Sequence, residues 1–187
     1  MNDAPSNARP SIRAATADDA RAVAALQIAS WQSAYRNDLP AAYLESLDLE
    51  ARTGRWRDVM ARPGVEVLVA ETVTGLAGFA AFGPAWDADL DPAQTAQLYN
   101  LHVDPTRWSQ GTGSDLWTAM MERLRGRWRE LALWVLPTNH RARGFYERRG
   151  LRPDGGRQRE PLAPGVAFDE IRYRGALAAP RSTPATE

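Results

Sequence analysis

The sequence predicts an α/β fold in which a mixed β-sheet is flanked by helices. Three observations indicate this class. Several segments carry apolar residues at spacings of three and four, which is typical of amphipathic helices. Other segments are short apolar runs bounded by glycine, proline or aspartate, which is typical of strands. Two of these runs are joined by a tight turn and the later ones alternate with helical segments, a combination typical of a mixed sheet.

The length of the chain favours a single domain. With 187 residues, of which 44% are hydrophobic, the chain can bury one substantial core. Residues 1–10 and 178–187 are polar and rich in proline and small side chains, so we expect both tails to be disordered. We therefore place one domain at residues 11–177.

The first part of this domain is expected to be a strand followed by helices. Residues 11–15 can form a short strand, and Thr16 has the residue type and position of a helix N-cap. The helix that follows should extend to about Tyr35. A second helical region, residues 40–60, begins with a proline and is expected to break near Asp48.

The rest of the domain is expected to alternate strands and helices. Apolar runs on either side of Thr74 and Gly75 predict a β-hairpin. The further expected elements are an acidic loop at 84–96, a strand at 97–103, a helix at about 113–125, a strand at 131–136, a helix from Asn139 to Gly150 and a strand at 168–174. Gly150 suits a helix end because glycine readily adopts the left-handed conformation.

Composition narrows the classes of function. The 23 basic and 23 acidic residues cancel, so the overall charge gives no reason to expect a nucleic acid or a membrane as partner. The chain has no cysteine and two histidines, so we expect no disulfide, no thiol nucleophile and no metal site. Every basic residue is arginine, so no lysine can form a Schiff base. Neither a membrane span nor a secretory signal is recognisable, and we expect a cytoplasmic protein.

The sequence RWSQGTGS, residues 107–114, lies between an expected strand and an expected helix. Its paired glycines would let backbone N–H groups approach an anion at the helix start. A dinucleotide-binding fingerprint requires a third glycine where Leu116 stands, and a Walker loop requires a lysine. Two interpretations remain: a diphosphate held by backbone amides alone, or an ordinary tight turn before an amphipathic helix.

The order of the elements and two motifs resemble the GNAT (Gcn5-related N-acetyltransferase) superfamily over about residues 12–174. The sequence VDPTRWSQGTG is similar to the family's turn that binds the pyrophosphate of acetyl-CoA. It departs from the family at Trp108, where Gln or Arg is usual, so a diphosphate contact by Arg107 or Trp108 stays open. The second motif comprises Asn139, Ala142, Phe145, Tyr146, Glu147, Gly150 and Leu151. The resemblance implies a mixed central sheet of about six to seven strands flanked by helices.

The resemblance also implies an acetyl-CoA site along the strand end and the glycine turn. Leu101, His102 and Val103 would lie beside the pantetheine arm. The residues around the diphosphate would be Ser109, Gln110, Gly111, Thr112, Gly113 and Ser114. Asn139 would hydrogen-bond the CoA arm or serve only as a helix cap.

Acetyl transfer from a thioester requires a held donor, a neutral amine, an oxyanion donor and a proton for the thiolate. Tyr146 matches the family tyrosine beside the CoA sulfur and would supply that proton; the structural alternative is a packed helix tyrosine. No general base is evident, because Gln97 and Tyr99 occupy the strand positions where the family often carries Glu or His. His102 is expected to be structural, since strand alternation places it on the opposite face.

Four aromatic residues are candidates for an acceptor pocket: Trp31, Tyr35, Trp86 and Tyr99. Aromatic side chains at helical spacing also suit a hydrophobic core, so this assignment has a structural alternative. The loop before the strand at 97–103 carries Asp87, Asp89 and Asp91. These carboxylates would either keep a linker solvated or attract a cationic amine.

We therefore expect an N-acetyltransferase that transfers acetyl from acetyl-CoA to a small-molecule amine by direct attack in a ternary complex. The alternative is a catalytically silent acetyl-CoA-binding regulatory module, which the lack of an evident base favours. Acetylation of protein or tRNA is disfavoured by the neutral charge. The expected partner is thus a small-molecule amine, without nucleic acid, membrane or metal, and since dimers are common in the family a homodimer is one expected assembly.

Overall fold

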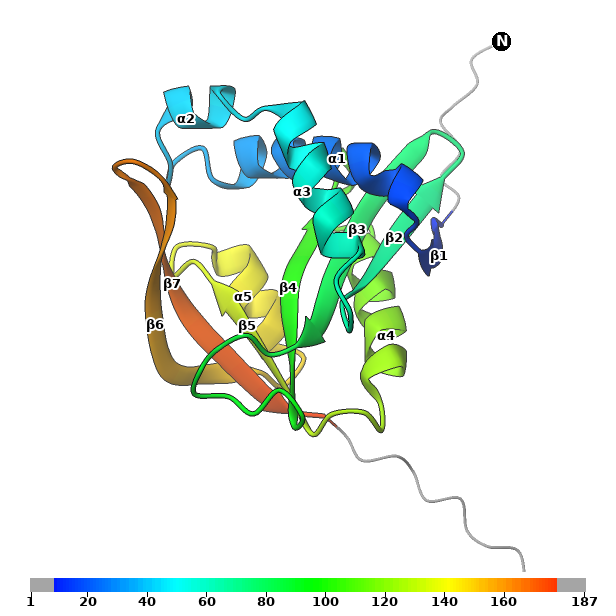
Figure 1. Cartoon of the computed structure of the whole chain (residues 1–187), viewed down its shortest axis with the longest axis vertical. Coiled ribbons are helices and arrows are strands. Elements are labelled where there is room, and N and C mark those ends of the chain that lie inside the picture. Colours follow the sequence, from blue (N-terminus) through cyan, green and yellow to red (C-terminus); the bar gives the residue numbers. More distant parts are fainter. Residues whose placement is uncertain (1–8, 178–187) are drawn as a thin grey trace, which may run out of the picture. The chain divides into compact units, whose positions relative to one another are not determined.

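The structure is a computed structural model that describes residues 9–177 (Figure 1). The predicted tails, 1–10 and 178–187, lie outside these residues apart from Arg9 and Pro10. A seven-stranded sheet with strand order β1-β2-β3-β4-β5-β7-β6 is flanked by helices, which confirms the predicted α/β class. The elements are β1 (Ser11–Ala14), η1 (Ala17–Asp19), α1 (Ala20–Ala34), α2 (Ala41–Glu45), α3 (Leu49–Met60), β2 (Glu66–Thr72), β3 (Gly75–Pro84), β4 (Thr95–Val103), η2 (Pro105–Arg107), α4 (Thr112–Leu124), β5 (Glu130–Val135), α5 (His140–Glu147), β6 (Arg152–Ala163) and β7 (Val166–Ala176).

The chain forms two compact units. Among the described residues, the first unit contains residues 9–82 together with Asn100–Met120, and the second contains Gly83–Tyr99 and residues 121–177. Strand β4 and helix α4 each contribute residues to both units. Within residues 9–177, no helix is long and apolar enough to cross a membrane.

In the first unit, β1, β2 and β3 pair antiparallel, and β2 and β3 form the predicted hairpin. Arg13 on β1 pairs with Asp19 and with Glu71 on β2, each at 2.8 Å, and so ties the first strand to the hairpin. Asp19 also accepts a hydrogen bond from the backbone N–H of Thr16, which stabilises the predicted helix start.

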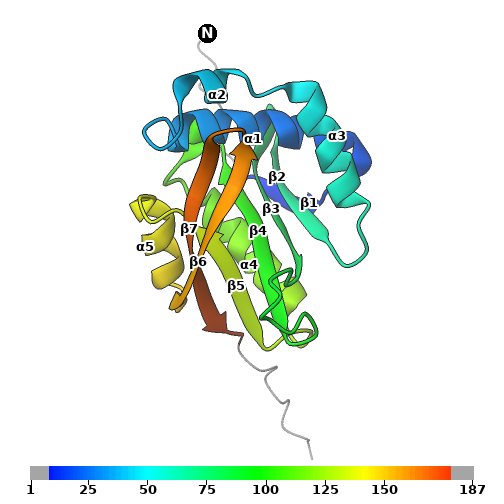
Figure 2. The same cartoon turned by 60° about the vertical axis from the view of Figure 1, so that its left-hand side comes forward.

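Helices α1 and α3 of the first unit pack side by side (Figures 1 and 2). The break predicted near Asp48 is confirmed. Asp48 has extended backbone angles, and its Oδ1 accepts a hydrogen bond from Ala51 N at 2.7 Å, so it caps α3 and separates it from α2.

In the second unit, β4 and β5 pair parallel through residues 95–98, and β7 pairs antiparallel with both β5 and β6. Strand β6 was not predicted. Its sequence RPDGGRQREPLA contains prolines and glycines that disfavour a strand, and it lies at the edge of the sheet with mostly exposed side chains (Figure 2). Its pairing with β7 supplies the hydrogen bonds that its own sequence does not favour.

Candidate functional site

The glycine turn follows β4 in the first unit and is held to the strand end by specific contacts. Asp104 N donates to Ala77 O of β3 at 2.9 Å, and Asp104 Oδ1 accepts from Thr106 N at 2.9 Å. The indole Nε1 of Trp108 donates to Val103 O at 3.0 Å. Trp108, which departs from the expected Gln or Arg, therefore fastens the turn to β4 with its side chain.

The backbone of the turn is left-handed at two positions. Ser109 has φ 64° and Gly111 has φ 96°. Such a conformation at a non-glycine residue costs about 1–3 kcal/mol, and it persists where the surroundings enforce it, often at functional sites. A Cβ added at Gly111 would have no heavy atom within 4 Å, so the space beside Gly111 is open.

Four consecutive backbone N–H groups at the start of α4 donate no hydrogen bond to any described residue. They belong to Gln110, Gly111, Thr112 and Gly113. The first amides that are bonded are those of Ser114 and Asp115, which both donate to Gly111 O, at 2.8 and 3.0 Å. Unbonded amides at the positive end of a helix dipole form a site for an anion.

The side chains of these residues contribute differently. Thr112 is buried, and its Cγ2 would lie 3.3 Å from a Cβ added at Gly78, so its side chain packs toward β3. Only its backbone N–H can serve an anion. Gln110 Nε2 donates to Thr106 O at 3.1 Å, which stabilises the turn.

His102 lies on β4 and is buried in the first unit. Its Nδ1 is 2.9 Å from Ser30 Oγ of α1, and its ring lies 5.3 Å from the ring of Phe79. Burial, together with the positive charge of Arg52, lowers the pKa of His102 to about 4. The ring is therefore neutral at pH 7 and structural, and a cofactor contact at this position would have to use the backbone.

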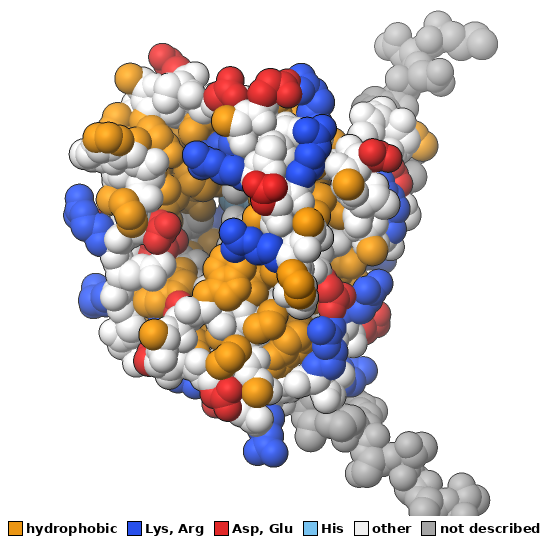
Figure 3. Space-filling view, in the orientation of Figure 1, with side chains coloured by type: hydrophobic (Ala, Val, Ile, Leu, Met, Phe, Trp, Pro, Cys, Tyr) orange, Lys and Arg blue, Asp and Glu red, His pale blue; other side chains and the backbone are white. Residues whose placement is uncertain are grey.

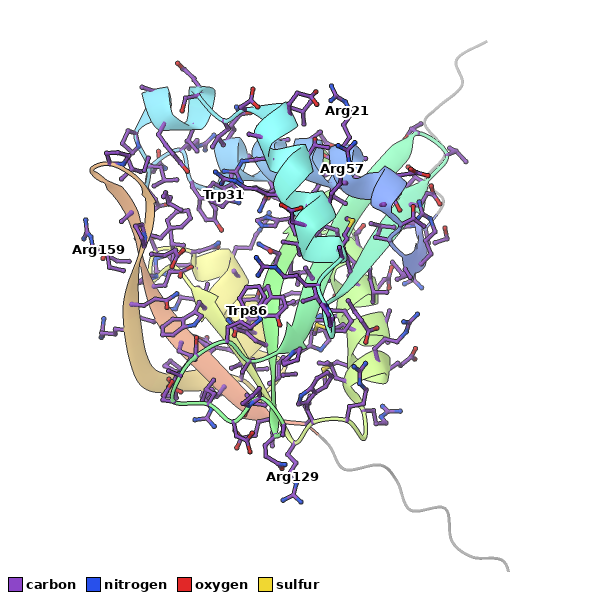
Figure 4. All side chains as sticks on the ribbon, in the orientation of Figure 1. Arg21, Trp31, Arg57, Trp86, Arg129 and Arg159 are labelled. Carbon is purple, nitrogen blue, oxygen red and sulfur yellow. The ribbon has the colours of Figure 1, made fainter. Side chains whose placement is uncertain are left out.

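The usual positions of a base on β4 are occupied by residues that hold the preceding loop in the second unit. Gln97 Oε1 accepts from Trp86 N at 2.8 Å, and the Tyr99 hydroxyl donates to Pro84 O. The rings of Trp86 and Tyr99 stack with centroids 3.9 Å apart, so these two predicted acceptor residues are brought together. Trp86 is 54% exposed, on a face where hydrophobic side chains gather (Figures 3 and 4).

An arginine anchors the acidic loop. The two expectations for the aspartates of this loop, a solvated linker or an attraction for a cationic amine, did not include such a partner. Arg172 of β7 pairs with Asp87 at 3.1 Å, with Asp89 at 2.7 Å and with Asp154 at 2.8 Å. Its hydrogen bonds lower the pKa of Asp89, and Asp87 also accepts from Trp134 Nε1 at 3.1 Å. The two aspartates neutralise a buried arginine, so the loop is neither a plain solvated linker nor a cluster of unpaired carboxylates.

Helix α5 carries the second predicted motif in the second unit. Asn139 Oδ1 accepts from Ala142 N at 3.0 Å, so the helix-cap alternative is realised, while its side-chain NH2 donates to no described residue. Tyr146 is buried and its ring makes an edge contact with Phe145, with centroids 5.5 Å apart. Glu147 accepts from the Tyr173 hydroxyl at 2.7 Å, which fastens α5 to β7.

The remaining predicted acceptor residues lie at the end of α1 in the first unit. The rings of Trp31 and Tyr35 meet edge to face at 5.7 Å. The guanidinium of Arg52, from α3, lies 4.4 Å above the Trp31 ring. Arg52 was not a predicted site residue. It falls on the buried face of α3 with Thr53 and Trp56, and a charged residue on such a face is the sequence feature that could have marked it as a candidate.

Comparison with known proteins identifies similar sequences and folds. The model of the acetyltransferase (GNAT) family matches residues 27–151. The chain is 28% identical over 130 residues to the uncharacterized N-acetyltransferase YuaI of Bacillus subtilis, covering 68% of this chain and 72% of that protein. It is 35% identical over 92 residues to an uncharacterized N-acetyltransferase of Archaeoglobus fulgidus, covering 48% of this chain and 63% of that protein.

Two solved structures share the fold. The PaiA N-acetyltransferase of Thermoplasma acidophilum in complex with coenzyme A aligns with a TM-score of 0.67 at 19% identity, over 87% of this chain and 96% of that chain. YncA of Salmonella typhimurium with its cofactor acetyl-CoA aligns with a TM-score of 0.68 at 17% identity, over 96% and 100% of the two chains.

Proposed function

Because the chain belongs to the acetyltransferase (GNAT) family, we propose that it transfers the acetyl group of acetyl-CoA to the amine of a small molecule. In a direct transfer the amine nitrogen bonds to the acetyl carbonyl carbon and the carbon–sulfur bond breaks. The nitrogen gives up one proton and the thiolate gains one. The relatives named N-acetyltransferase and the fold neighbours solved with CoA or acetyl-CoA support this reaction.

The observation that carries the proposal is the row of four unbonded amides at the start of α4. A diphosphate supplies several negatively charged oxygens, and each can accept a charge-assisted hydrogen bond from one of these N–H groups. The open space at Gly111 lets such a group approach without meeting a side chain. In this proposal Leu101 and Val103 of the first unit lie along the pantetheine arm.

The composition of the chain removes two side reactions from an assay of this activity. Since the protein has no cysteine, a thiol reagent added to the reaction reports only the CoA released. Since it has no lysine, it cannot acetylate itself at a lysine side chain. We expect CoA release that depends on one or more amines in a panel, with the acetylated amine identified by mass spectrometry.

A silent acetyl-CoA-binding module is the second candidate, because Gln97 and Tyr99 hold the preceding loop and are not bases. It predicts saturable acetyl-CoA binding without release of CoA for any amine. If acetyl-CoA stabilises the protein against heat no more than ATP does, both candidates are wrong.

Within the enzyme proposal, Tyr146 supplies the proton to the thiolate. Tyr146→Phe should lower kcat by about 100-fold, since a positioned acid contributes about 10²–10⁴-fold, and should change the KM for acetyl-CoA little. Steady-state kinetics at saturating amine measure this. Tyr173→Phe is the matched control, because it also removes a hydroxyl near α5 but one that bonds Glu147 and Arg143; its kcat should be close to that of the parent. A parental kcat in Tyr146→Phe would leave this tyrosine only a packing role.

A further inference from the structure

Arg52 is a buried arginine of the first unit. It lies on α3, is 9% exposed, and its Nη1 donates to Gln27 Oε1 at 3.1 Å. Its guanidinium stacks on Trp31 with 4.4 Å to the ring centroid. Among residues 9–177, no carboxylate forms an ion pair with Arg52.

Three arginines of the β-sheet, unlike Arg52 on α3, form ion pairs with carboxylates. Arg172, which is equally buried, faces three aspartates, and Arg13 faces Asp19 and Glu71. Arg174 pairs with Glu130. These three arginines each pair with a carboxylate, whereas Arg52 pairs with none among residues 9–177.

The surroundings of Arg52 compensate its charge only partly. Burial lowers the pKa of Arg52 and the charge of Arg55 adds to this, while the phenol of Tyr43 opposes it. Gln27 Oε1 is shared, because it also accepts from Trp56 Nε1 at 3.0 Å. A guanidinium has five N–H donors and is costly to remove from water without acceptors. An anion that paired with Arg52 would relieve this cost.

We propose that Arg52 binds the negatively charged group of the acceptor, and that the acceptor is an amine that also carries a carboxylate, such as an amino acid. This rests on the proposed acetyl transfer and names the substrate class for it. A carboxylate matches the planar fork of a guanidinium in a bidentate pair. Gln27 and His102, which lie beside Arg52, are uncharged at pH 7, so neither supplies the negative charge that would pair with the guanidinium.

The test compares each of the common amino acids with its carboxamide, which keeps the amine and removes the negative charge. For the parent we expect kcat/KM to favour the best acid over its amide by at least about 10-fold. Arg52→Gln should lower kcat/KM for that acid by about 100-fold and leave the amide within about 3-fold. Arg57→Gln removes the same charge from an exposed position of the same helix (Figure 4) and should retain the preference for the acid.

A second measurement requires no turnover. Sodium 3-phenylpropionate cannot be acetylated at nitrogen, and we expect it to raise the Tm of the parent and of Arg57→Gln but not that of Arg52→Gln, whereas 3-phenylpropionamide raises none. If no amine is acetylated but this pattern holds, the acetyl-transfer proposal is wrong and the anion site stands. Arg52→Met, which replaces the buried charge by an apolar side chain, serves if Arg52→Gln does not fold.

Three results would overturn the inference: equal kcat/KM for acids and amides in the parent, an unchanged preference in folded Arg52→Gln, or an equal loss for acid and amide. The last would make Arg52 only a structural support. A preference for amines that carry phosphate over those that carry carboxylate would contradict the proposed substrate class.

Discussion

Gly113→Val is expected to weaken acetyl-CoA binding by at least about 100-fold while the protein stays folded. Gly113 lies in the first turn of α4 and is not left-handed, so a side chain is compatible with the backbone, and an isopropyl group there would be attached next to one of the four unbonded amides. Loss of two or more charge-assisted hydrogen bonds accounts for a change of this size. Isothermal titration of acetyl-CoA measures it directly.

Gly54→Val is the matched control. Gly54 is also helical, and a Cβ there would have no heavy atom within 4 Å, so the substitution changes helix propensity in the same way without approaching the turn. It should bind acetyl-CoA like the parent. Gly111→Val is less informative, because φ of 96° strains any side chain there whether or not a ligand binds. Parental affinity in folded Gly113→Val would mean that the amides of this turn do not hold the diphosphate.

Thermal unfolding compares acetyl-CoA binding by the same three proteins through the shift in Tm. A ligand present at about 100 times its Kd stabilises the native state by about 2.7 kcal/mol. We expect acetyl-CoA to raise the Tm of the parent and of Gly54→Val and to leave the Tm of Gly113→Val nearly unchanged.

Acidification is expected to destabilise the protein between pH 6.5 and 4 through His102. The pKa of this residue falls from its ordinary 6.5 to about 4 in the folded state, so in this range the unfolded chain binds a proton that the folded protein does not. Stability is therefore complete above about pH 6.5 and decreases as the pH falls toward 4. The difference corresponds to a loss of about 3 kcal/mol in the free energy of unfolding.

Urea unfolding at several pH values from 7 to 4 measures this slope. His102→Gln removes the titrating ring and should be flatter than the parent over this range, although it is less stable at pH 7 because the contact with Ser30 is altered. His140→Gln, at the exposed start of α5, should keep the slope of the parent. Parallel curves for the parent and His102→Gln would show that His102 is not the acid-sensitive group.

Features that depend on neighbours in the sequence were predictable. The start of the first helix near Thr16, the cap at Asp48 and the cap at Asn139 each use a side chain and a backbone group a few positions apart. The glycine turn is equally local, because its two left-handed residues and its unbonded amides arise where a strand passes into a helix.

Other features depend on partners far away along the chain. Strand β6 exists because β7 pairs with it, and its own prolines and glycines point to a loop. Gln97 occupies a strand position where a base was expected from the resemblance, yet its side-chain oxygen accepts a hydrogen bond from the backbone N–H of Trp86, eleven residues earlier. Asp87 of the acidic loop pairs with Arg172, which lies 85 residues later in the sequence. The spacing of the aspartates within the loop therefore could not reveal their role.

The class of fold, the helix ends and the turn that presents its amides were predictable because hydrogen bonds and side-chain periodicity within a few residues decide them. The pairing of the charges, by contrast, depends on how the chain folds. Asp87 and Asp89 pair with Arg172, whereas no carboxylate among the described residues pairs with Arg52, because burial and ion pairing depend on which distant segments pack together.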